Sequence, residues 1–593
     1  MNEIPLNKDI NLVPINLVPD KEMNPSTEGA ESNLHQFKLP IEYLDTCVVH
    51  KLSNVVVNDL ELVSASSSPC MYDILLNPKH IFAKNMIEKW KNSFSSDIDF
   101  LKQTQQVISN TKSNQTPIDC ESLTNIWKDV YETPAFYDRY SYIDIEKFHF
   151  VNKMANFLGI WTIVNLLSPV LSIFLPLILV IAPFVLLKIQ SAPINFSTYL
   201  SVLKEVAKKH ALGKAFTSMN EFSVNNLLYI LFTLGMYGMQ MYQNVKSCIR
   251  FYKNINEVNT NLLTLKNFVN YSITNFEDYL AVNSGLTKYA GFCEDVSLHR
   301  DYLDSLREEL KEVKPFSFGV SKCFEVGYLL KCYYCLHSVP EYKKAFSYAI
   351  SFEGYRSNLE SLSEHINNGT VHFGNICTSK KNVFTNQIYP AHFENSIKNT
   401  INLKKNLIIT GPNASGKTTQ LKTTAINVIF TQQFGLGFYE HADFVPYTHI
   451  HSYLNIPDTS GRDSLFQAEA RRCKEILDII DNDKTETDKH FCIFDELFSG
   501  TNAEEATSAS FAFLKHLQKI ENVDFILTTH FVKLCQKVKK AKNMRIDNFK
   551  MDAELNGNSI IFHYKLVKGI SKIKAAKLIL IQMGFPEDIL RNI

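Results

Sequence analysis

The residues best suited to chemistry stand together in the stretch Gly411-Pro-Asn-Ala-Ser-Gly-Lys-Thr-Thr419. The apolar run 407–410 before it predicts a buried strand, and the pattern from 419 to about 430 predicts a helix. A strand, a Gly-x-x-x-x-Gly-Lys-Thr loop and a helix form the pattern of a phosphate-binding loop. Glycines let backbone N–H groups turn toward an anion, and the helix N-terminus adds a partial positive charge.

The loop residues have expected roles. We expect Lys417 to reach the β- and γ-phosphates of a nucleotide and the Thr418 hydroxyl to ligate Mg²⁺. The residues predicted to bind the nucleotide are Gly411, Asn413, Ser415, Gly416, Lys417, Thr418 and Thr419.

Two later strands end in side chains that complete such a site. The apolar run 491–494 is followed by Asp495 and Glu496, and the run 525–529 is followed by His530. We expect Asp495 to hold the Mg²⁺ shell and Glu496 to act as the general base for the attacking water. His530 would hydrogen-bond the γ-phosphate or that water, so the predicted catalytic residues are Glu496 and His530.

Composition divides the chain of 593 residues into several regions. Lys plus Arg and Asp plus Glu are both 61, so the overall charge favours no class of partner. Patterns such as 80–92 and 255–279 predict long amphipathic helices before the α/β part. We predict a disordered tail (1–38), a helical core (39–155), apolar segments with a basic connection (156–245), a helical lever region (246–375) and an α/β ATPase domain (376–593).

Two apolar runs interrupt the helical region. Residues 157–187 carry no charge, and 166–187 are dominated by Leu, Ile, Val and Phe. About 20 apolar residues suffice to span a bilayer, so the first run predicts membrane contact, as a bent spanning helix or as a re-entrant hairpin. The second run, 222–245, is weaker because it includes Asn and Gln. The alternative is that both runs are buried helices of a large soluble domain.

The connection between the runs is basic. It carries Lys188, Lys204, Lys208, Lys209 and Lys214. Two spanning helices would place these lysines across the membrane from the ATPase, against the tendency of basic loops to stay in the cytosol. Interfacial or re-entrant helices would avoid that conflict.

The motifs together resemble the MutS family of mismatch-repair ATPases. The phosphate loop, Asp495-Glu-Leu-Phe-Ser-Gly-Thr501 and Thr529-His-Phe531 each match a motif of that family. The segment Ser460-Gly-Arg-Asp-Ser-Leu-Phe466, with Glu469, resembles its Ser-Gly-Arg signature with one extra residue after the arginine. The tail from Val567 through Gly584-Phe-Pro-Glu-Asp588 resembles its terminal helix-turn-helix, and 348–362 resembles the helix that leads into its ATPase.

The resemblance implies an ABC-type P-loop fold at the C-terminus, ATP and Mg²⁺ as cofactors, and a homodimer or a heterodimer with a paralogue. Each site would be completed by the Ser464 loop of the other subunit, and closure by ATP would act on the helical levers. DNA is a partner that the family implies. The family's Phe-x-Glu mismatch wedge belongs to an N-terminal domain, whereas Phe-x-Glu first occurs here at Phe292-Cys-Glu294. The apolar runs resemble instead a membrane-associated branch of the family.

Three functions follow from these patterns. The first is an ATP-driven dimeric switch at a membrane, with its ATPase domain in the cytosol. The second is a soluble, DNA-binding repair or recombination ATPase of the nucleus or cytoplasm, whose apolar runs are buried core. The third, a transporter ATPase, is disfavoured because the sequence lacks the Leu-Ser-Gly-Gly-Gln signature.

Overall fold

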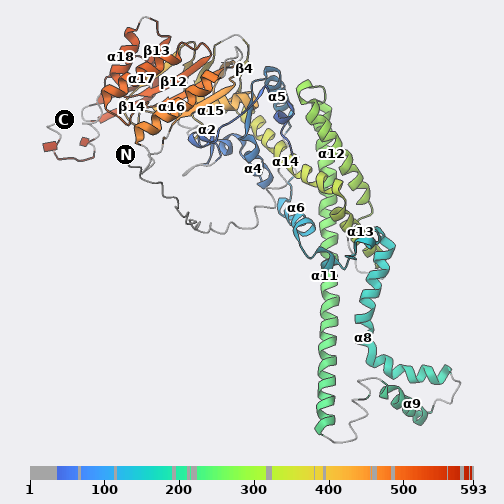
Figure 1. Cartoon of the computed structure of the whole chain (residues 1–593). Helices are drawn as coiled ribbons and strands as arrows, with labels where there is room; N and C mark the ends of the chain where they lie inside the picture. The colour runs from blue at the N-terminus through green and yellow to red at the C-terminus, as the bar shows by residue number, and fades with distance from the viewer. Residues whose placement is uncertain are drawn as a thin grey trace, which may run out of the picture.

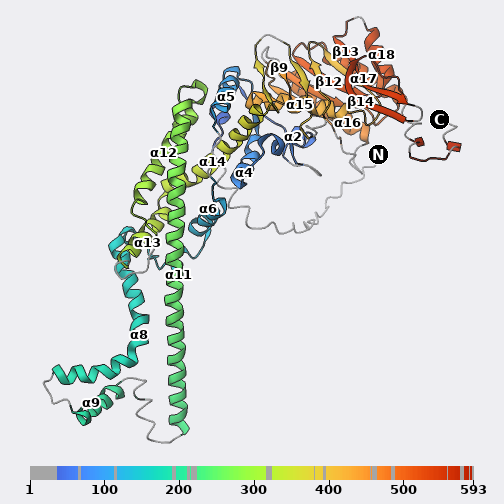
Figure 2. The same cartoon turned by 180° about the vertical axis from the view of Figure 1, so that it is seen from behind.

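The computed structural model has an α/β domain at one end and a long helical arm at the other (Figures 1 and 2). The structure describes residues 37–63, 69–112, 117–189, 195–209, 214, 224–315, 323–378, 381–391, 396–454, 456, 464–482, 488–541, 543–556, 559–573, 580–581, 583–586 and 588–589.

A six-stranded sheet in the order β10-β11-β12-β7-β13-β14 forms the α/β domain. Its strands are β7 (Asn406–Thr410), β10 (His449–Tyr453), β11 (His490–Asp495), β12 (Val523–Thr529), β13 (Ile546–Asn556) and β14 (Ser559–Lys568). Neighbouring strands are parallel, except that β13 and β14 pair antiparallel. The register places Asp495 beside Thr528 and Thr529 beside Thr410. The ends of β7, β11 and β12 therefore meet at one edge of the sheet.

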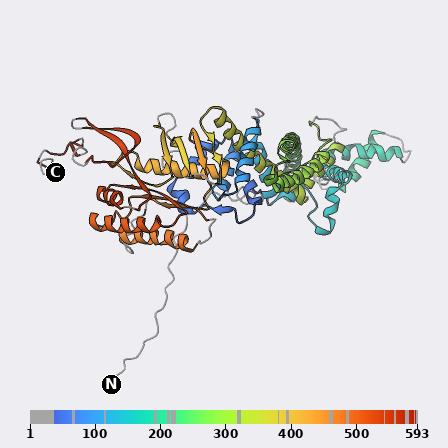
Figure 3. The same ribbon diagram turned by 90° about the horizontal axis from the view of Figure 1, so that it is seen from above.

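Helices cover both faces of this sheet (Figure 3). They are α15 (Lys417–Phe434), α16 (Leu465–Asn482), α17 (Ala503–Leu517) and α18 (Val532–Lys540). The side chains of β7 alternate between two cores: Ile408 packs with residues of α16, α17 and α18, and Leu407 and Ile409 pack with residues of α15. Burial on both faces explains why β7 and β11 are almost continuously apolar.

Smaller sheets flank α15. A four-stranded sheet has the order β4-β9-β5-β6, and β3 pairs with β8. These strands are β3 (His372–Phe373), β4 (Asn375–Ile376), β5 (Val383–Gln387), β6 (Asn399–Asn402), β8 (Leu436–Gly437) and β9 (His441–Phe444).

The helical body joins the α/β domain to the arm. Its longer helices are α4 (Ile81–Trp90), α5 (Ile98–Asn110), α12 (Ala290–Glu309), α13 (Cys323–Ser338), α14 (Pro340–Asn367) and the second half of α11 (Val224–Asn283). Shorter elements complete it: η1 (Pro40–Tyr43), β1 (Val49–Lys51), α2 (Asn54–Asp59), α3 (Met71–Leu76), β2 (Ser93–Ser95), α6 (Cys120–Trp127), η2 (Lys128–Glu132), α7 (Phe136–Tyr140), η3 (Glu146–Lys153) and η5 (Thr287–Tyr289). Its core continues into the core around α15.

The C-terminal end of α15 is fixed to the helical body by buried amide side chains. Gln433 donates from Nε2 to Trp90 O at 2.7 Å and Ser93 O at 2.9 Å, and its Oε1 accepts from Tyr72 Oη at 2.8 Å. Gln432 donates to Ser95 O at 3.0 Å. These bonds connect α15 to backbone carbonyls of β2 and α4, and Trp90 O also accepts from Tyr72 Oη at 3.2 Å.

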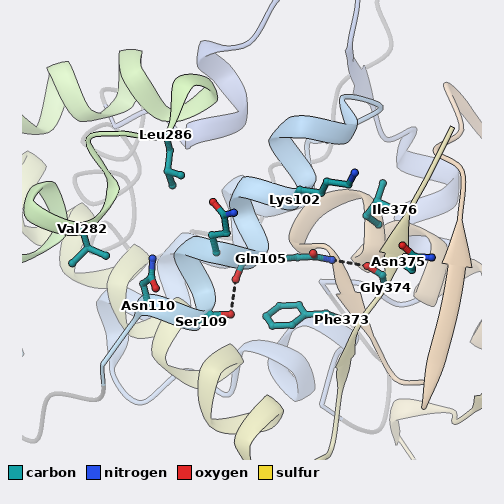
Figure 4. A pocket seen from close by; sticks show the side chains of 11 residues that line it. Lys102, Gln105, Ser109, Asn110, Val282, Leu286, Phe373, Gly374, Asn375 and Ile376 are labelled. Carbon is teal, nitrogen blue, oxygen red and sulfur yellow. Dashed lines mark hydrogen bonds between the residues drawn. The ribbon is translucent and has the colours of Figure 1, made fainter.

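Helix α5 adds a second connection at the same place. Gln105 donates from Nε2 to Gly374 O at 2.7 Å (Figure 4) and also to Gly435 O at 2.7 Å. Gly435 ends α15 with φ +71°, and a Cβ there would lie 2.6 Å from Gln105 Cγ. A glycine is therefore required where α5 approaches the end of α15.

The arm consists of α8 (Ala155–Ile189), α9 (Phe196–Lys208) and the first half of α11. The arm joins the helical body where α8 and α13 cross closely. A Cβ on Gly327 of α13 would lie 2.2 Å from Ala155 O of α8. Beyond that crossing, α8 bends and its later half runs across the direction of α11, with α9 beside it (Figures 1 and 2). Pro169, Pro176 and Pro183 fall in α8, and prolines are a common cause of such bends.

The apolar runs are not core. Large apolar side chains of the arm are exposed, including Phe174, Phe184, Leu228 and Phe232. These exposed side chains do not fit the prediction that both runs are wholly buried core, although α8 packs against α13, α9 and α11 and some of its apolar side chains, such as Leu187, are buried. Within the same described residues, the structure contains no helix with both the length and the apolar composition needed to cross a membrane.

Most local predictions match the structure. Residues 80–92 become α4, capped by His80, and 255–279 lie within α11. Residues 407–410 lie in β7, and the predicted helix after the loop is α15. The predicted tail lies almost wholly outside the described residues.

The junction gives a stability prediction. Gln433→Ala removes three hydrogen bonds of a buried side chain, so we expect the free energy of unfolding to fall by about 2 kcal/mol. Urea unfolding followed by circular dichroism measures it. Gln106→Ala, on the exposed side of α5, is the control and should change stability by less than about 0.5 kcal/mol. Equal effects of the two substitutions would contradict the assigned role of Gln433.

Candidate functional site

Two cavities are candidates for a binding site. The larger, about 720 Å³, lies between α5, the end of α11 and β3–β4 (Figure 4), and Lys102 is the one ionisable side chain among the described residues that line it. The smaller, about 510 Å³, is lined by the phosphate loop and by Glu496. Only the smaller cavity combines a loop suited to bind anions with a base, so it is the candidate functional site.

The loop turns sharply between β7 and α15. Ala414 and Gly416 have φ values of +62° and +89°, and Gly416 is the first residue before the helix. Two left-handed residues so close together reverse the chain and aim backbone N–H groups into the loop. Ser415 is buried, and its Oγ has no hydrogen-bond partner among the described residues. A buried hydroxyl without a partner at this position fits a loop built to receive phosphate.

Lys417 lies inside the loop. Its Nζ donates to Gly411 O at 3.2 Å and to Pro412 O at 3.1 Å, and lies 3.9 Å from Glu496 Oε1. The residue is 6% exposed, and this burial lowers the pKa of the ammonium group, while Glu496 and Asp495 oppose that shift. A polyphosphate entering the cavity would supply negative charge to an ammonium group that is now held by two carbonyls.

Thr418 and Asp495 meet as the sequence predicts for a metal site. Thr418 donates from Oγ1 to Asp495 Oδ2 at 2.7 Å, and Thr528 donates to the other carboxylate oxygen. A hydroxyl and a carboxylate are oxygen ligands of the kind Mg²⁺ prefers, so these residues fit the ion. Mg²⁺ bound there would neutralise charge on the phosphates.

Glu496 and His530 form a contact at the mouth of the site. His530 Nε2 lies 2.6 Å from Glu496 Oε1 and 3.4 Å from Lys417 Nζ. Glu496 has φ +53°, a strained value for a residue with a side chain, and its N–H donates to Thr528 O at 3.0 Å. This turn brings the carboxylate back over the phosphate loop.

The contacts of Glu496 set its protonation. The hydrogen bond from His530 lowers the pKa of Glu496 below its ordinary value of 4.5, and the charges of His530 and Lys417 act in the same direction against partial burial. Glu496 is therefore ionised at neutral pH, as a general base must be.

Ser464 lies outside the cavity. It is exposed and caps α16: Gln467 N donates to Ser464 Oγ at 3.3 Å, and Ser464 N donates to Gln467 Oε1 at 2.9 Å. One turn later, buried Glu469 accepts from Ser499 N at 3.1 Å and from Gly500 N at 3.1 Å. Helix α16 thus connects an exposed serine to the loop that follows Glu496. Residues 460–463 lie outside the described residues.

The cavity includes residues that the motifs do not indicate. Gln387, Tyr389, Ile397, Met551 and Tyr564 line it with Asn413, Gly416, Lys417, Thr418 and Thr419. Gln387 ends β5, Tyr389 follows that strand, Ile397 precedes β6, and Met551 and Tyr564 lie on β13 and β14. No short spacing connects them to the loop, so only the tertiary structure identifies them.

Comparisons with known proteins agree with this geometry. The family model for MutS domain V matches residues 407–592. MutS protein homolog 4 of Mus musculus is 35% identical over 178 residues, covering 28% of this chain and 17% of that protein. The DNA mismatch repair protein MutS of Fusobacterium nucleatum subsp. nucleatum is 28% identical over 203 residues, covering 33% of this chain and 21% of that protein. Residues 407–592 of this chain are therefore similar to MutS domain V.

The match to the MutS family model covers residues 407–592. The chain spans only about a fifth of the length of these relatives, and MutS protein homolog 4 of Homo sapiens is likewise covered over 18%, at 32% identity. The matched residues 407–592 include the phosphate loop, Asp495, Glu496 and His530.

Two other features of the family resemblance are the Phe-x-Glu sequence and the terminal helix-turn-helix. Phe292 of the Phe-x-Glu sequence is fully buried in the aromatic core of α12, within 5.4 Å of the Tyr355 ring centre, so it is not an exposed wedge. Much of the segment predicted as helix-turn-helix lies outside the described residues, and that prediction stays untested.

The contact between His530 and Glu496 predicts a pH dependence. The lowered pKa keeps Glu496 ionised as the pH falls, so the acid limb of the hydrolysis rate should lie below pH 4.5. His530→Asn removes the positive charge and the imidazole hydrogen bond, which raises the pKa of Glu496 and moves the acid limb to higher pH. Rate measurements from pH 4 to 8 check this. His516→Asn, on the exposed surface of α17, should leave the limb in place, and an unmoved limb in His530→Asn would contradict the assignment.

Proposed function

We propose that this protein is an ATP-hydrolysing switch of the MutS type that acts as a dimer on DNA. The observation that carries the proposal is the meeting of Lys417, Thr418, Asp495, Glu496 and His530 at the ends of β7, β11 and β12. Lys417 binds the phosphates, and Thr418 and Asp495 hold the metal. Glu496 takes a proton from the attacking water, and His530 orients Glu496 and senses the γ-phosphate.

The nucleotide state would be passed on through α15. The helix begins at the phosphate loop and ends at Gln432 and Gln433, whose amides bond to β2 and α4. If ATP binding shifts the loop, α15 would therefore also shift at its C-terminal end, where Gln432 and Gln433 bond to the helical body. Such a shift gives a switch only if ATP favours one of two arrangements of this junction.

DNA as the partner is supported by the relatives and not by a charge pattern. Several relatives bear the name DNA mismatch repair protein MutS. A protein that contacts the phosphate backbone loses affinity steeply as salt rises. Binding of the full chain to duplex DNA that does not weaken with salt would oppose this part of the proposal. On this proposal the protein is found in the nucleus or cytoplasm.

A second candidate function places the same switch at a membrane, with the ATPase domain in the cytosol. The observation that favours it is the exposure of the apolar side chains on α8 and α11. Extraction distinguishes the two: detergent should release a membrane-docked protein from cell membranes, whereas salt should release a protein held on DNA.

The first test concerns nucleotide binding. Lys417→Ala removes the charge inside the loop, and we expect ATP to bind about 100-fold more weakly, as for the loss of one or two charged hydrogen bonds. Isothermal titration measures the affinity. Lys422→Ala is the matched control, because Lys422 lies on the same helix and pairs with Glu61 at 3.0 Å, away from the cavity. Normal affinity in Lys417→Ala would refute the phosphate-loop assignment.

The second test separates binding from hydrolysis. Glu496→Gln keeps the shape of the side chain but removes the base, so ATP should still bind while turnover falls by about 10²- to 10⁴-fold. Steady-state phosphate release measures turnover. Glu504→Gln, exposed at the start of α17, should leave turnover unchanged. A rate in Glu496→Gln close to the unsubstituted rate would remove Glu496 as the base.

The third test concerns the dimer. If Ser464 completes the partner's site, Lys417→Ala and Ser464→Ala subunits each form defective homodimers, but a mixed dimer has one intact site. Mixing the two variants should then restore part of the ATPase activity. Activity of the mixture no higher than that of either variant alone would contradict completion by the partner.

A further inference from the structure

The exposed apolar surface of the arm covers most of the circumference of its helices, and each helix also has a buried side, at Leu187 on α8 and Ile230 on α11. On α11, Leu227 and Leu228 are 53% and 60% exposed, and Leu231 and Phe232 are 60% and 69% exposed. Neighbouring residues point about 100° apart on a helix, so these exposed side chains face several directions. Exposed side chains on α8, such as Leu177, Ile178, Val180 and Ile181, are distributed in the same way.

The distribution of these exposed side chains favours lipid over a second copy of the chain as the surroundings of the arm. A second copy of the chain would cover one side of each helix and leave the other sides in water. A helix that is apolar all round needs apolar surroundings on all sides. A lipid layer provides such surroundings because acyl chains flow around a helix.

Helix α9 has a different pattern. Phe196, Tyr199, Leu200, Leu203 and Val206 recur at spacings of three and four and form one apolar side. Phe196 is 79% exposed and Leu200 is 45% exposed, so this side is only partly covered by α8. The opposite side carries Ser197, Ser201, Lys204 and Lys208.

The charges near the tip of the arm are mainly positive. Residues 155–245 contain five lysines, Lys188, Lys204, Lys208, Lys209 and Lys214, and two acidic residues, Glu205 and Glu221. Lys204 and Lys208 are exposed on α9, and Lys208 also lies 3.2 Å from Glu205. An amphipathic helix with lysines on its polar side is suited to lie in the plane of an anionic lipid surface.

We infer that α9 is an interfacial helix that recognises anionic lipid headgroups through Lys204 and Lys208 while the apolar surfaces of α8 and α11 enter the acyl layer. This inference rests on the second candidate function, membrane docking, and adds the lipid class and the recognising residues. It requires α9 to lie along the surface, and it requires no helix to cross the bilayer.

Vesicle flotation of the full chain tests the inference. The vesicles are phosphatidylcholine alone, or phosphatidylcholine mixed with phosphatidylserine. We expect stronger binding to the mixed vesicles, and weaker binding to them as salt rises. Lys204→Gln with Lys208→Gln should weaken binding to the mixed vesicles by about tenfold or more and leave binding to neutral vesicles unchanged. Lys539→Gln with Lys540→Gln, two exposed lysines at the end of α18, is the matched control.

A second variant tests the apolar side of α9. Phe196→Ser with Leu200→Ser should weaken binding to both kinds of vesicle, whereas Leu298→Ser, an exposed apolar residue on α12, should not. Circular dichroism of each variant checks that the helices are kept.

The outcomes separate the inference from the function it rests on. Equal binding to both kinds of vesicle, unaffected by the lysine substitutions, overturns headgroup recognition and leaves membrane docking standing. No binding to either vesicle, with self-association of the chain in sedimentation, overturns docking as well and assigns the arm to a second copy.

Discussion

The structure depends on one helix that is held at both ends. The N-terminus of α15 carries Lys417 and Thr418 of the site, and its C-terminal turn carries Gln432 and Gln433, which bond to carbonyls of the helical body. Because both amides are buried, breaking these bonds would leave polar groups without water or a partner. The two parts of the molecule are thus connected by hydrogen bonds that are costly to break.

The site itself is a balance of opposite charges. Lys417 and His530 face Glu496, and Thr418 and Thr528 both donate to Asp495. The cations keep Glu496 ionised, and the backbone strain at Glu496 holds it over the loop. The helix that carries exposed Ser464 also holds the loop after Glu496 through Glu469. A contact made at exposed Ser464 would therefore have a short route to the Glu496 carboxylate, across one turn of α16.

The sequence indicates which groups of the candidate site lie close together because these groups follow strand ends. An apolar run followed by Asp495 and Glu496 locates both carboxylates at the edge of a parallel sheet, and the run before His530 does the same. Tyr389, Ile397 and Tyr564 were not predictable, since they reach the cavity through long-range packing, from just after β5, from just before β6 and from β14. The apolar runs show a further limit. Composition shows that they need apolar surroundings, but only the fold shows that no element of the described chain covers Phe174 or Phe232.

The most direct measurement of the central claim is hydrogen–deuterium exchange on the Glu496→Gln chain with and without ATP and Mg²⁺. The account predicts that nucleotide slows exchange in the phosphate loop and also changes it at β2 and α5, where the far end of α15 is bound. A change confined to the loop and the adjoining strand ends, with β2 and α5 unaltered, would contradict the claim that α15 carries the nucleotide state to the helical body.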